Sequence, residues 1–476
     1  MTAREAPKAA IQEVRLLERD VSLRMPFRFG VVTLTEACEA FVRVRLRLEQ
    51  GREGWGTAAE LLAPKWFDKN PRLTNEENME QLRTALRVAR ELYLAERAPE
   101  AAFARFARRH GPQVEACRRL DLNPLIAGYG PALLDRAILD ALFRLTGTSF
   151  YDGMRANLPA IDAVDFAPVA DRFDFDAFLS GLSPQQTIHA RHTVGLADPI
   201  TEADQSAGER INDGLPETLE DVVEGYGHTY FKLKVAGDLD GDIERLGRIA
   251  TVLDRIDEPY YASLDGNEQY DSVGEVVELW ERIEGTPDLE RLCRSILYIE
   301  QPIRRDVALS ADVSELARGR PVIIDESDAD FDAFPRARAM GYTGISSKTC
   351  KGVYRSLINA ARCAVWNAET PGRYFLSGED LTTQPGIAVQ QDLALVSLLG
   401  LTHVERNGHH YVRGMSALST AEQQGFRRAH PDLYREVDGE TCLNIQDGRL
   451  AIGSLGCIGF AVGAEPDWST MREMPR

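Results

Sequence analysis

Charged residues follow a series of short apolar segments in the middle of the chain. The segments are rich in Val, Ile, Leu, Tyr and Phe. They stand about two to three dozen residues apart, the length of a strand, a helix and two loops. The carboxyl ends of parallel strands meet at one mouth of a barrel, so this spacing predicts a shared catalytic site there. The charged residues are Lys232, Lys234, Asp265, Glu300, Asp325, Glu326 and Lys348.

The acidic members of this series suggest a site for a hard cation. Three carboxylates on neighbouring strand ends are oxygen ligands that suit Mg²⁺ or Mn²⁺. Few histidines and cysteines accompany them, which argues against zinc at this site. His189 and His192 stand three positions apart and would face opposite sides of a strand, so we expect no shared metal pair. His409 and His410 follow the last apolar segment and are assigned to a loop.

The lysines add an acid–base function to the predicted site. Lys232 and Lys234 stand two positions apart in a strand, so both side chains point the same way. A lysine inside a barrel is costly unless it is paired or functional, and burial or nearby cations lower its pKa toward that of a useful base. Lys348 comes four strands later, across the mouth. Two lysine bases beside a divalent cation suit removal of a proton next to a carboxylate, with the cation stabilising the enediolate.

Eight apolar segments alternate with helical patterns, which predicts an α/β fold built on a barrel. They are TIHARHTVG, YFKLKV, YYASLD, ILYIEQ, PVIID, GISSK, YFLSG and THVE. Before them, strand-like IQEVRLLE and AFVRVRLRLE precede helical patterns over Glu76–Arg109 and Pro131–Leu145, as in a separate α+β domain. After them, LNIQDGRLAIG resembles a short hairpin. We expect an α+β domain over 1–155, a connection or insertion over 156–186, the barrel over 187–414 and a tail over 415–476.

Composition limits the partners of the chain. Its 476 residues carry 55 Lys and Arg against 74 Asp and Glu, a net charge of −19, which disfavours nucleic acid and anionic membranes. No apolar run reaches the length of a membrane span, and the N-terminus lacks a signal-peptide core. The seven cysteines are scattered without a CxxC pair, so neither a disulfide framework nor a structural zinc site is expected. A cytoplasmic protein is therefore expected.

With these motifs in order, the chain resembles the enolase superfamily, and most closely its muconate-lactonizing and mandelate racemase-like enzymes. The motifs are FKLKV, SLDGN, YIEQP, IDES and SSKTCKG. The resemblance implies a modified TIM barrel, (β/α)7β, with an N-terminal capping domain that the C-terminal tail completes. It further implies Asp265, Glu300 and Asp325 as Mg²⁺ ligands and Lys234 and Lys348 as bases on opposite faces of the substrate. It implies that Lys232 contacts the substrate carboxylate or tunes Lys234.

The chain departs from the family pattern at several positions. Glu326 competes with Asp325 as the third ligand, and Lys351 accompanies Lys348. Thr57 stands where many relatives carry Glu, and no His appears in YFLSGED. The loops Met25–Thr35 and Ala58–Asn70 are candidates to close over the site. Three residues that end the last two strands are candidates to bind the distal part of the substrate: Glu379, Glu405 and Asn407.

These observations predict an enzyme that abstracts the α-proton of a small carboxylate substrate. The sequence leaves open whether it is a racemase or epimerase, or a β-eliminating dehydratase or cycloisomerase. Glu379 and Glu405 suggest a substrate with a polar distal end. The alternative is a non-catalytic homologue that acts as a binding or scaffold protein. We expect a homo-oligomer.

Overall fold

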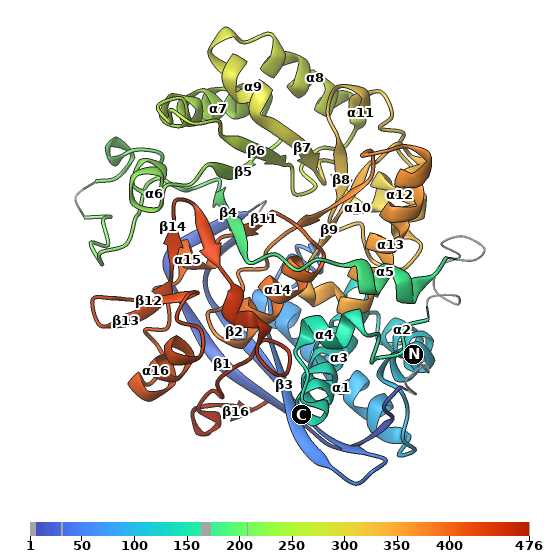
Figure 1. Cartoon of the computed structure of the whole chain (residues 1–476). Coiled ribbons are helices and arrows are strands. Elements are labelled where there is room, and N and C mark those ends of the chain that lie inside the picture. The colour runs from blue at the N-terminus through green and yellow to red at the C-terminus, as the bar shows by residue number, and fades with distance from the viewer. Residues whose placement is uncertain (1–5, 30–31, 163–172, 207, 476) are drawn as a thin grey trace.

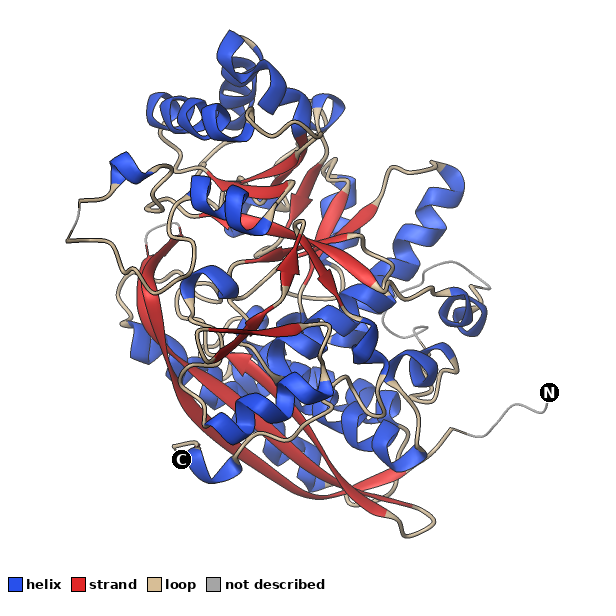
Figure 2. Cartoon of the chain, turned by 60° about the vertical axis from the view of Figure 1, so that its left-hand side comes forward, coloured by secondary structure: helices blue, strands red, loops and turns tan. Residues whose placement is uncertain are grey.

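Eight parallel strands close into a barrel, with the last strand pairing with the first (Figures 1 and 2). The computed structural model describes residues 6–29, 32–162, 173–206 and 208–475. Every apolar segment expected to be a barrel strand is one. In chain order the strands are β4 (Thr187–Val194), β5 (Tyr230–Lys234), β6 (Tyr261–Asp265), β7 (Ile296–Glu300), β8 (Val322–Ile324), β9 (Gly344–Ser347), β10 (Phe375–Gly378) and β11 (His403–Arg406).

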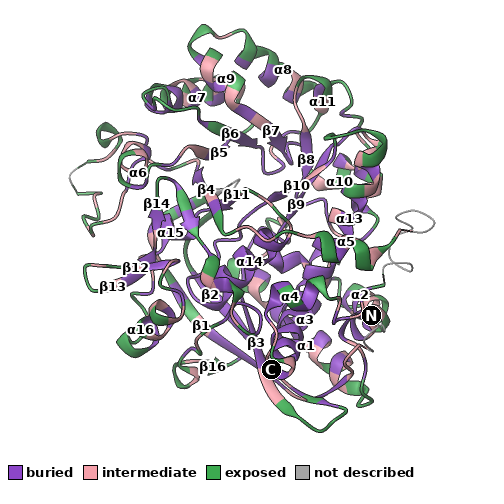
Figure 3. Cartoon of the chain, viewed as in Figure 1, coloured by how far each residue is buried: buried purple, intermediate pink, exposed green. Residues whose placement is uncertain are grey.

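Helices follow the strands and pack on the outside of the barrel, and all residues of α14 are buried (Figure 3). Alternating strands and helices confirm the predicted (β/α)7β barrel. The helices of this part are α6 (Leu219–Tyr226), α7 (Leu239–Leu253), α8 (Val273–Glu284), α9 (Glu290–Ser295), α10 (Arg305–Ala308), α11 (Leu316–Gly319), α12 (Ala333–Ala339), α13 (Val353–Glu369), α14 (Ile387–Leu398) and α15 (Gly408–Tyr411).

An antiparallel sheet forms the N-terminal domain, which confirms the second half of the predicted fold class. Its strands are β1 (Ala9–Phe29), β2 (Val32–Leu48) and β3 (Glu53–Leu61), in the order β16–β1–β2–β3. Helices α1 (Asn75–Ala95), α2 (Ala102–Arg118) and α3 (Pro124–Thr146) lie beside it. Gly56 lets α3 approach β3 closely, because a Cβ there would lie 2.2 Å from the carbonyl oxygen of Ala137.

The helices of this domain differ from the predicted ranges. The stretch Glu76–Arg109 is interrupted after α1, whose C-cap Glu96 has an extended backbone. Pro99 lies in this interruption, and a proline disfavours helical geometry in the residue before it. Helix α3 starts seven residues before the expected Pro131, at Pro124, because the Asn123 side chain caps it by accepting a hydrogen bond from the backbone N–H of Ile126.

The C-terminal tail joins the barrel to the N-terminal domain. It contains α16 (Thr420–Ala429), β12 (Tyr434–Val437), β13 (Glu440–Leu443), β14 (Ile445–Gln446), β15 (Arg449–Ala451) and β16 (Arg472–Glu473). The predicted hairpin is β14–β15, and β15 extends the barrel sheet beside β4. Strand β16 pairs with β1, and the Phe460 ring stacks on Phe150 with centroids 3.8 Å apart.

Two short helices lie around the expected connection over 156–186. They are α4 (Phe150–Arg155) and α5 (Phe175–Gly181). Residues 163–172 of this connection are outside the described residues. All seven cysteines are free thiols, as expected. In the described part of the chain, no helix combines the length and apolar character needed to cross a membrane.

Candidate active site

Lys232 lies at the centre of the barrel, surrounded by carboxylates. It alternates on β5 with Phe231 and Leu233, which pack into the apolar layer outside the barrel. The Lys232 side chain is 1 % exposed. Its Nζ lies 2.8 Å from oxygens of Asp265, Glu300 and Glu379, and 2.9 Å from Glu405. One ammonium therefore joins acidic residues from four strands or strand ends.

The other two predicted bases each pair with one acid at the mouth. Lys234 Nζ lies 2.5 Å from Asp265 Oδ2, and Lys348 Nζ lies 2.7 Å from Asp325 Oδ2. Lys348 also faces the Trp66 ring, 4.3 Å from its centroid. Lys234 reaches the mouth from β5 and Lys348 from the end of β9, on the two sides of one cavity.

The cavity between the barrel and the N-terminal domain has a volume of about 30 Å³. That volume holds about two water molecules. A carboxylate substrate therefore requires side chains at the mouth to move. The lining residues are Phe27, Leu34, Leu61, Ala63, Trp66, Lys232, Lys234, Asp265, Asn267, Lys348, Asp380, Leu381, Thr382, Glu405 and Asn407.

The three candidate substrate-binding residues occupy different positions. Glu405 and Asn407 line the cavity. Glu379 lies deeper and is fully buried, where it pairs with Arg191 and accepts a hydrogen bond from the Tyr298 hydroxyl at 3.0 Å. The cavity wall that the N-terminal domain supplies is apolar, formed by Phe27, Leu34, Leu61, Ala63 and Trp66. The acidic pair thus lies on the barrel side and has cationic partners there, and its role in binding a substrate stays a prediction.

Burial and charge act in opposite directions on the titratable groups. Burial by itself lowers the pKa of Lys232, but Asp265, Glu300 and the other acids outweigh it and raise the pKa well above its usual range. Burial also opposes the charge of Lys348, and Asp325 reverses this effect, so its pKa is raised too. Burial raises the pKa of Glu300 well above its usual range, and neighbouring Asp265 adds to the shift. In this arrangement Lys232 and Lys348 are therefore both ammonium groups.

The structure places Asp325 and Glu326 in different surroundings. Asp325 also binds Lys351, whose Nζ lies 3.0 Å from Oδ1. Glu326 points toward the N-terminal domain, 3.7 Å from Lys69 Nζ and 3.2 Å from Asn267 Nδ2. Sequence reasoning did not assign Lys351 this role. The ISSKTCK spacing contains a signal for it, because Lys351 comes three residues after Lys348 in a single helical turn, η3 (Thr349–Lys351).

The acidic residues have the character of a divalent-cation site. Asp265, Glu300 and Asp325 supply only oxygen donors, as Mg²⁺ prefers. Glu300 Oε2 and Glu326 Oε2 are buried without a hydrogen-bond partner in the described structure. An orphaned buried carboxylate oxygen is costly unless a cation or donor approaches it. The donor types therefore suit a hard cation, but the oxygens of these three residues do not all lie within 4.8 Å of one another in the described structure, so they would have to close in around the ion.

Contacts across the mouth fasten one covering loop to the barrel. Lys69 Nζ lies 2.7 Å from Glu268 Oε2, just after β6. Arg305 binds the same carboxylate at 2.7 Å and donates to the backbone carbonyls of Trp66 and Phe67 at 2.8 and 2.9 Å. This network holds Trp66 over Lys348. The sequence marked the loop, but gave no signal for its anchors.

Comparison with known proteins supports this architecture. No family model and no curated protein matches the chain. Solved structures do match along nearly its whole length. Muconate lactonizing enzyme from Pseudomonas fluorescens, complexed with muconolactone, is 17% identical with a TM-score of 0.59, covering 98% of this chain and 100% of its own.

Two further structures contain magnesium. Dipeptide epimerase from Enterococcus faecalis, complexed with Mg and the dipeptide L-Leu-L-Tyr, is 15% identical with a TM-score of 0.58, covering 95% of this chain and 99% of its own. An enolase from Bradyrhizobium, complexed with magnesium and mandelic acid, is also 15% identical with a TM-score of 0.58, covering 97% of both chains. The fold of this chain is that of the enolase superfamily.

Proposed function

We propose that this chain is a metal-dependent enzyme of the enolase superfamily that abstracts the α-proton of a carboxylate substrate. The observation that carries the proposal is the placement of Lys234 and Lys348 on two sides of one cavity. Two bases on opposite faces of a substrate carbon allow one to remove a proton and the other to deliver it. The magnesium-containing structures of similar fold support the class of cofactor.

The expected ligands of the cation are Asp265, Glu300 and Asp325, with Mg²⁺ or Mn²⁺ as the ion. When bound, the cation supplies the positive charge that stabilises an enediolate and competes with the ammonium groups for the carboxylates. Asp325 is preferred to Glu326 because it lies beside Lys348, whereas Glu326 lies beside Lys69.

The lysines divide the remaining work. Lys234 or Lys348, once neutral, takes the α-proton from its own face of the substrate. The other lysine, as an ammonium group, returns a proton to the opposite face in a racemase or epimerase, or protonates a leaving group in a β-elimination. Lys232 remains charged among its four acids and holds the developing carboxylate charge in place.

The shape of the cavity refines the expected substrate. Its N-terminal wall offers Phe27, Leu34 and Trp66, and none of the described residues that line this wall carries a charge that would compensate a desolvated one. We therefore propose a carboxylate with an apolar group next to the reacting carbon. This replaces the polar distal end that Glu379 and Glu405 suggested.

Proton exchange in D₂O tests the proposal directly. The enzyme with Mg²⁺ is incubated with a panel of N-acyl amino acids, dipeptides, hydroxy acids and acid sugars, and α-deuterium incorporation is followed by NMR. We expect exchange with at least one apolar member. Lys234→Ala and Lys348→Ala should each lower the rate by about 10²–10⁴-fold, while Lys8→Ala, distant from the mouth, leaves it unchanged.

Different outcomes separate the alternatives. Exchange that persists in both lysine variants would contradict their assignment as bases. Tight binding of a carboxylate without exchange or turnover would favour the non-catalytic binding protein. A single variant that still exchanges the proton of one stereoisomer would identify a racemase or epimerase with two working faces.

A further inference from the structure

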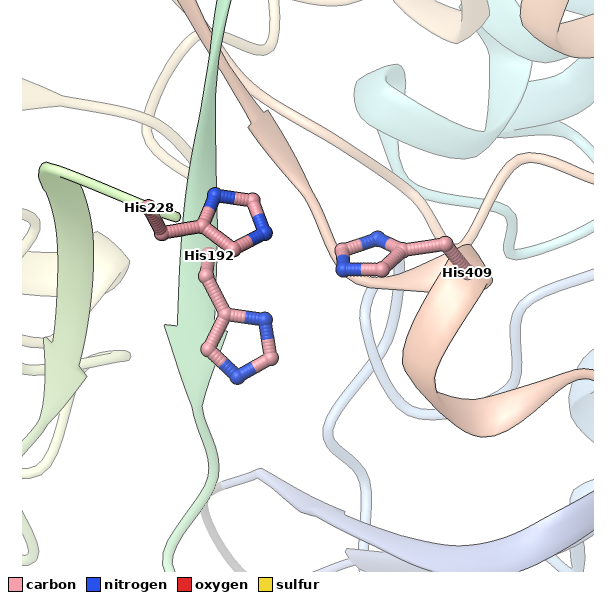
Figure 4. Close-up of side chains that lie close together, drawn as sticks. All are labelled: His192, His228 and His409. Atoms are coloured by element: carbon pink, nitrogen blue, oxygen red, sulfur yellow. The ribbon is translucent and has the colours of Figure 1, made fainter. Parts of the chain in front are cut away.

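Three histidines gather on the outer side of the barrel wall, where the last strand closes on the first (Figure 4). On β4, Arg191 and Thr193 reach into the barrel to Glu379 and Glu405, so His192 between them faces outward. His228 precedes β5, and His409 lies in α15 after β11. The cluster is therefore outside the lysine-lined mouth.

The three rings present free nitrogens to one another. Their ligating atoms all lie within 4.8 Å of one another. In the described part of the chain, this is the one group of three metal-ligating side chains that meets this criterion. Figure 4 shows each ring turning a nitrogen toward a common space. His192 Nδ1, His228 Nε2 and both nitrogens of His409 are buried without a hydrogen-bond partner in the described structure. Such nitrogens are costly to bury unless a ligand binds them.

The backbone presets one ring as a ligand. His228 Nδ1 lies 2.8 Å from the carbonyl oxygen of Ala190, so this nitrogen carries the proton and donates it. Its Nε2 lone pair is then free and faces the cluster. Metal-bound histidines typically use their second nitrogen in this way. Burial lowers the pKa of all three imidazoles, that of His228 to about 4, so the rings are neutral near pH 7 as ligands must be.

We propose that His192, His228 and His409 bind a divalent transition-metal ion of the Zn²⁺ type. Three imidazole nitrogens suit Zn²⁺, Co²⁺ or Ni²⁺ and are poor ligands for Mg²⁺. A tetrahedral ion with bonds of about 2.0–2.1 Å separates its ligands by about 3.3 Å, so the rings close inward on binding. A water molecule would complete the coordination of the ion.

Positive charges near the cluster are already neutralised. Arg24, which lies beside His410, forms two hydrogen bonds with the Asp213 carboxylate, at 2.7 and 2.8 Å. Arg406, three residues before His409, pairs with Asp392 and lies 3.4 Å from Asp380. A dication in the cluster therefore meets no unpaired cation from these two arginines.

The site would connect the barrel closure to the mouth. Its ligands come from the first strand, the start of the second and the segment after the last, which are distant in sequence, and a clip across so long a loop stabilises most. In the same segment as His409, Asn407 lines the cavity, and Tyr411 stacks on Phe27 at 4.2 Å. By joining these segments, the ion would act as a structural clip that holds Asn407 and, through Tyr411, Phe27 in place at the cavity.

Cobalt binding tests the site. Full-length protein without a histidine tag is first freed of metal with a chelator and then saturated with Mg²⁺. It is titrated with Co²⁺, and binding is monitored by visible absorption and by X-ray absorption at the cobalt edge. We expect one Co²⁺ per chain, low coordination number and imidazole nitrogens around the ion. His228→Gln and His409→Gln should raise the Kd by about 100-fold or more, since even outer partners of metal ligands change affinity about 10–100-fold. His189→Gln is the control, because His189 lies on β4 like His192 but outside the cluster, and this variant should leave the Kd unchanged.

The proposal is overturned if wild-type protein binds no Co²⁺, if both glutamine variants bind as wild type does, or if the ion has an all-oxygen shell. Circular dichroism checks that the variants fold. If either does not, the X-ray absorption spectrum of the wild type still decides between nitrogen and oxygen ligands. Because Mg²⁺ occupies the oxygen site and no turnover is measured, the result is independent of the proposed enzyme activity.

Discussion

Titratable side chains are buried both at the mouth of the barrel and on the outer side of its seam, the place where β11 pairs with β4. The two places compensate the burial differently. At the mouth, Lys232 has four acids within 2.9 Å. At the seam, His192, His228 and His409 are neutral and keep free nitrogens. A buried charge needs an opposite charge in contact with it, whereas a neutral imidazole can be buried without a bound ligand. The two clusters therefore differ in whether the buried groups carry compensated charges, and not in burial alone.

Removing the central ammonium should give the largest effect. Lys232→Met leaves four acids facing one another, so we expect a loss of about 3–5 kcal/mol in the free energy of unfolding at pH 7, measured by urea denaturation. His228→Gln without metal should cost only about 1 kcal/mol, for the bond to Ala190. Equal losses in the two variants would erase the contrast between the clusters.

The same Lys232→Met variant should respond to pH and cations. Without the ammonium, mutual repulsion raises the pKa of the acids above their unfolded values. Their protonated forms then favour the fold, so the deficit relative to wild type shrinks as the pH falls from 7 to 5 and grows as it rises. Added Mg²⁺ should reduce the deficit at pH 7. A deficit that does not change with pH or Mg²⁺ would argue for lost packing rather than repulsion.

Mild acid should destabilise the histidine cluster before it breaks the ion pairs of Asp265 and Glu405 with Lys232. The folded pKa of His228 is about 4, below the unfolded value of about 6.5, so its contribution is present above pH 6.5 and is lost as the pH falls toward 4. The slope is about 1.4 kcal/mol per pH unit for each histidine kept neutral. Asp265 and Glu405, whose pKa values are lowered by Lys232 against the effect of burial, lose their contribution only below about pH 4.

Unfolding free energies at pH 6.5, 5.5 and 4.5 measure this slope. His228→Gln should flatten it by the share of one histidine. Zn²⁺ should also steepen the dependence in the wild type, because protons compete with the ion for the rings. An unchanged slope in His228→Gln would mean that this ring is protonated in the folded protein and cannot be a ligand.

The smallest effect concerns the loop that covers the mouth. Lys69→Met removes the contact with Glu268, and because Lys69 is 23% exposed, we expect a loss of at most about 1 kcal/mol in stability. Trp66 should then hold its place over Lys348 less often, lowering kcat/KM by about 3–10-fold. Arg72→Met, an exposed change two residues beyond this loop, is the control. Equal kinetics in the two variants would show that this anchor does not position the loop.

The sequence by itself determined the barrel. Several strands read as short apolar segments followed by a charge, and parallel strands bring such ends together whatever lies between them. Of the charged residues predicted at the mouth, Lys232, Lys234, Asp265 and Lys348 line the cavity, and Glu300 and Asp325 are joined to it by ion pairs with Lys232 and Lys348. Their catalytic and metal-binding roles stay predictions. The sequence also excluded a disulfide framework, as the free thiols confirm.

Only the tertiary structure decided how those side chains are paired and what surrounds them. Glu379 turned out to lie beneath Lys232 with Arg191, because its depth in the barrel depends on the packing of other strands. The anchors of the covering loop come from two domains. His409 is separated from His192 and His228 along the chain by nearly the whole barrel, and only the closure of β11 on β4 brings it to them. Spacing along a chain carries no signal for a contact that ring closure creates.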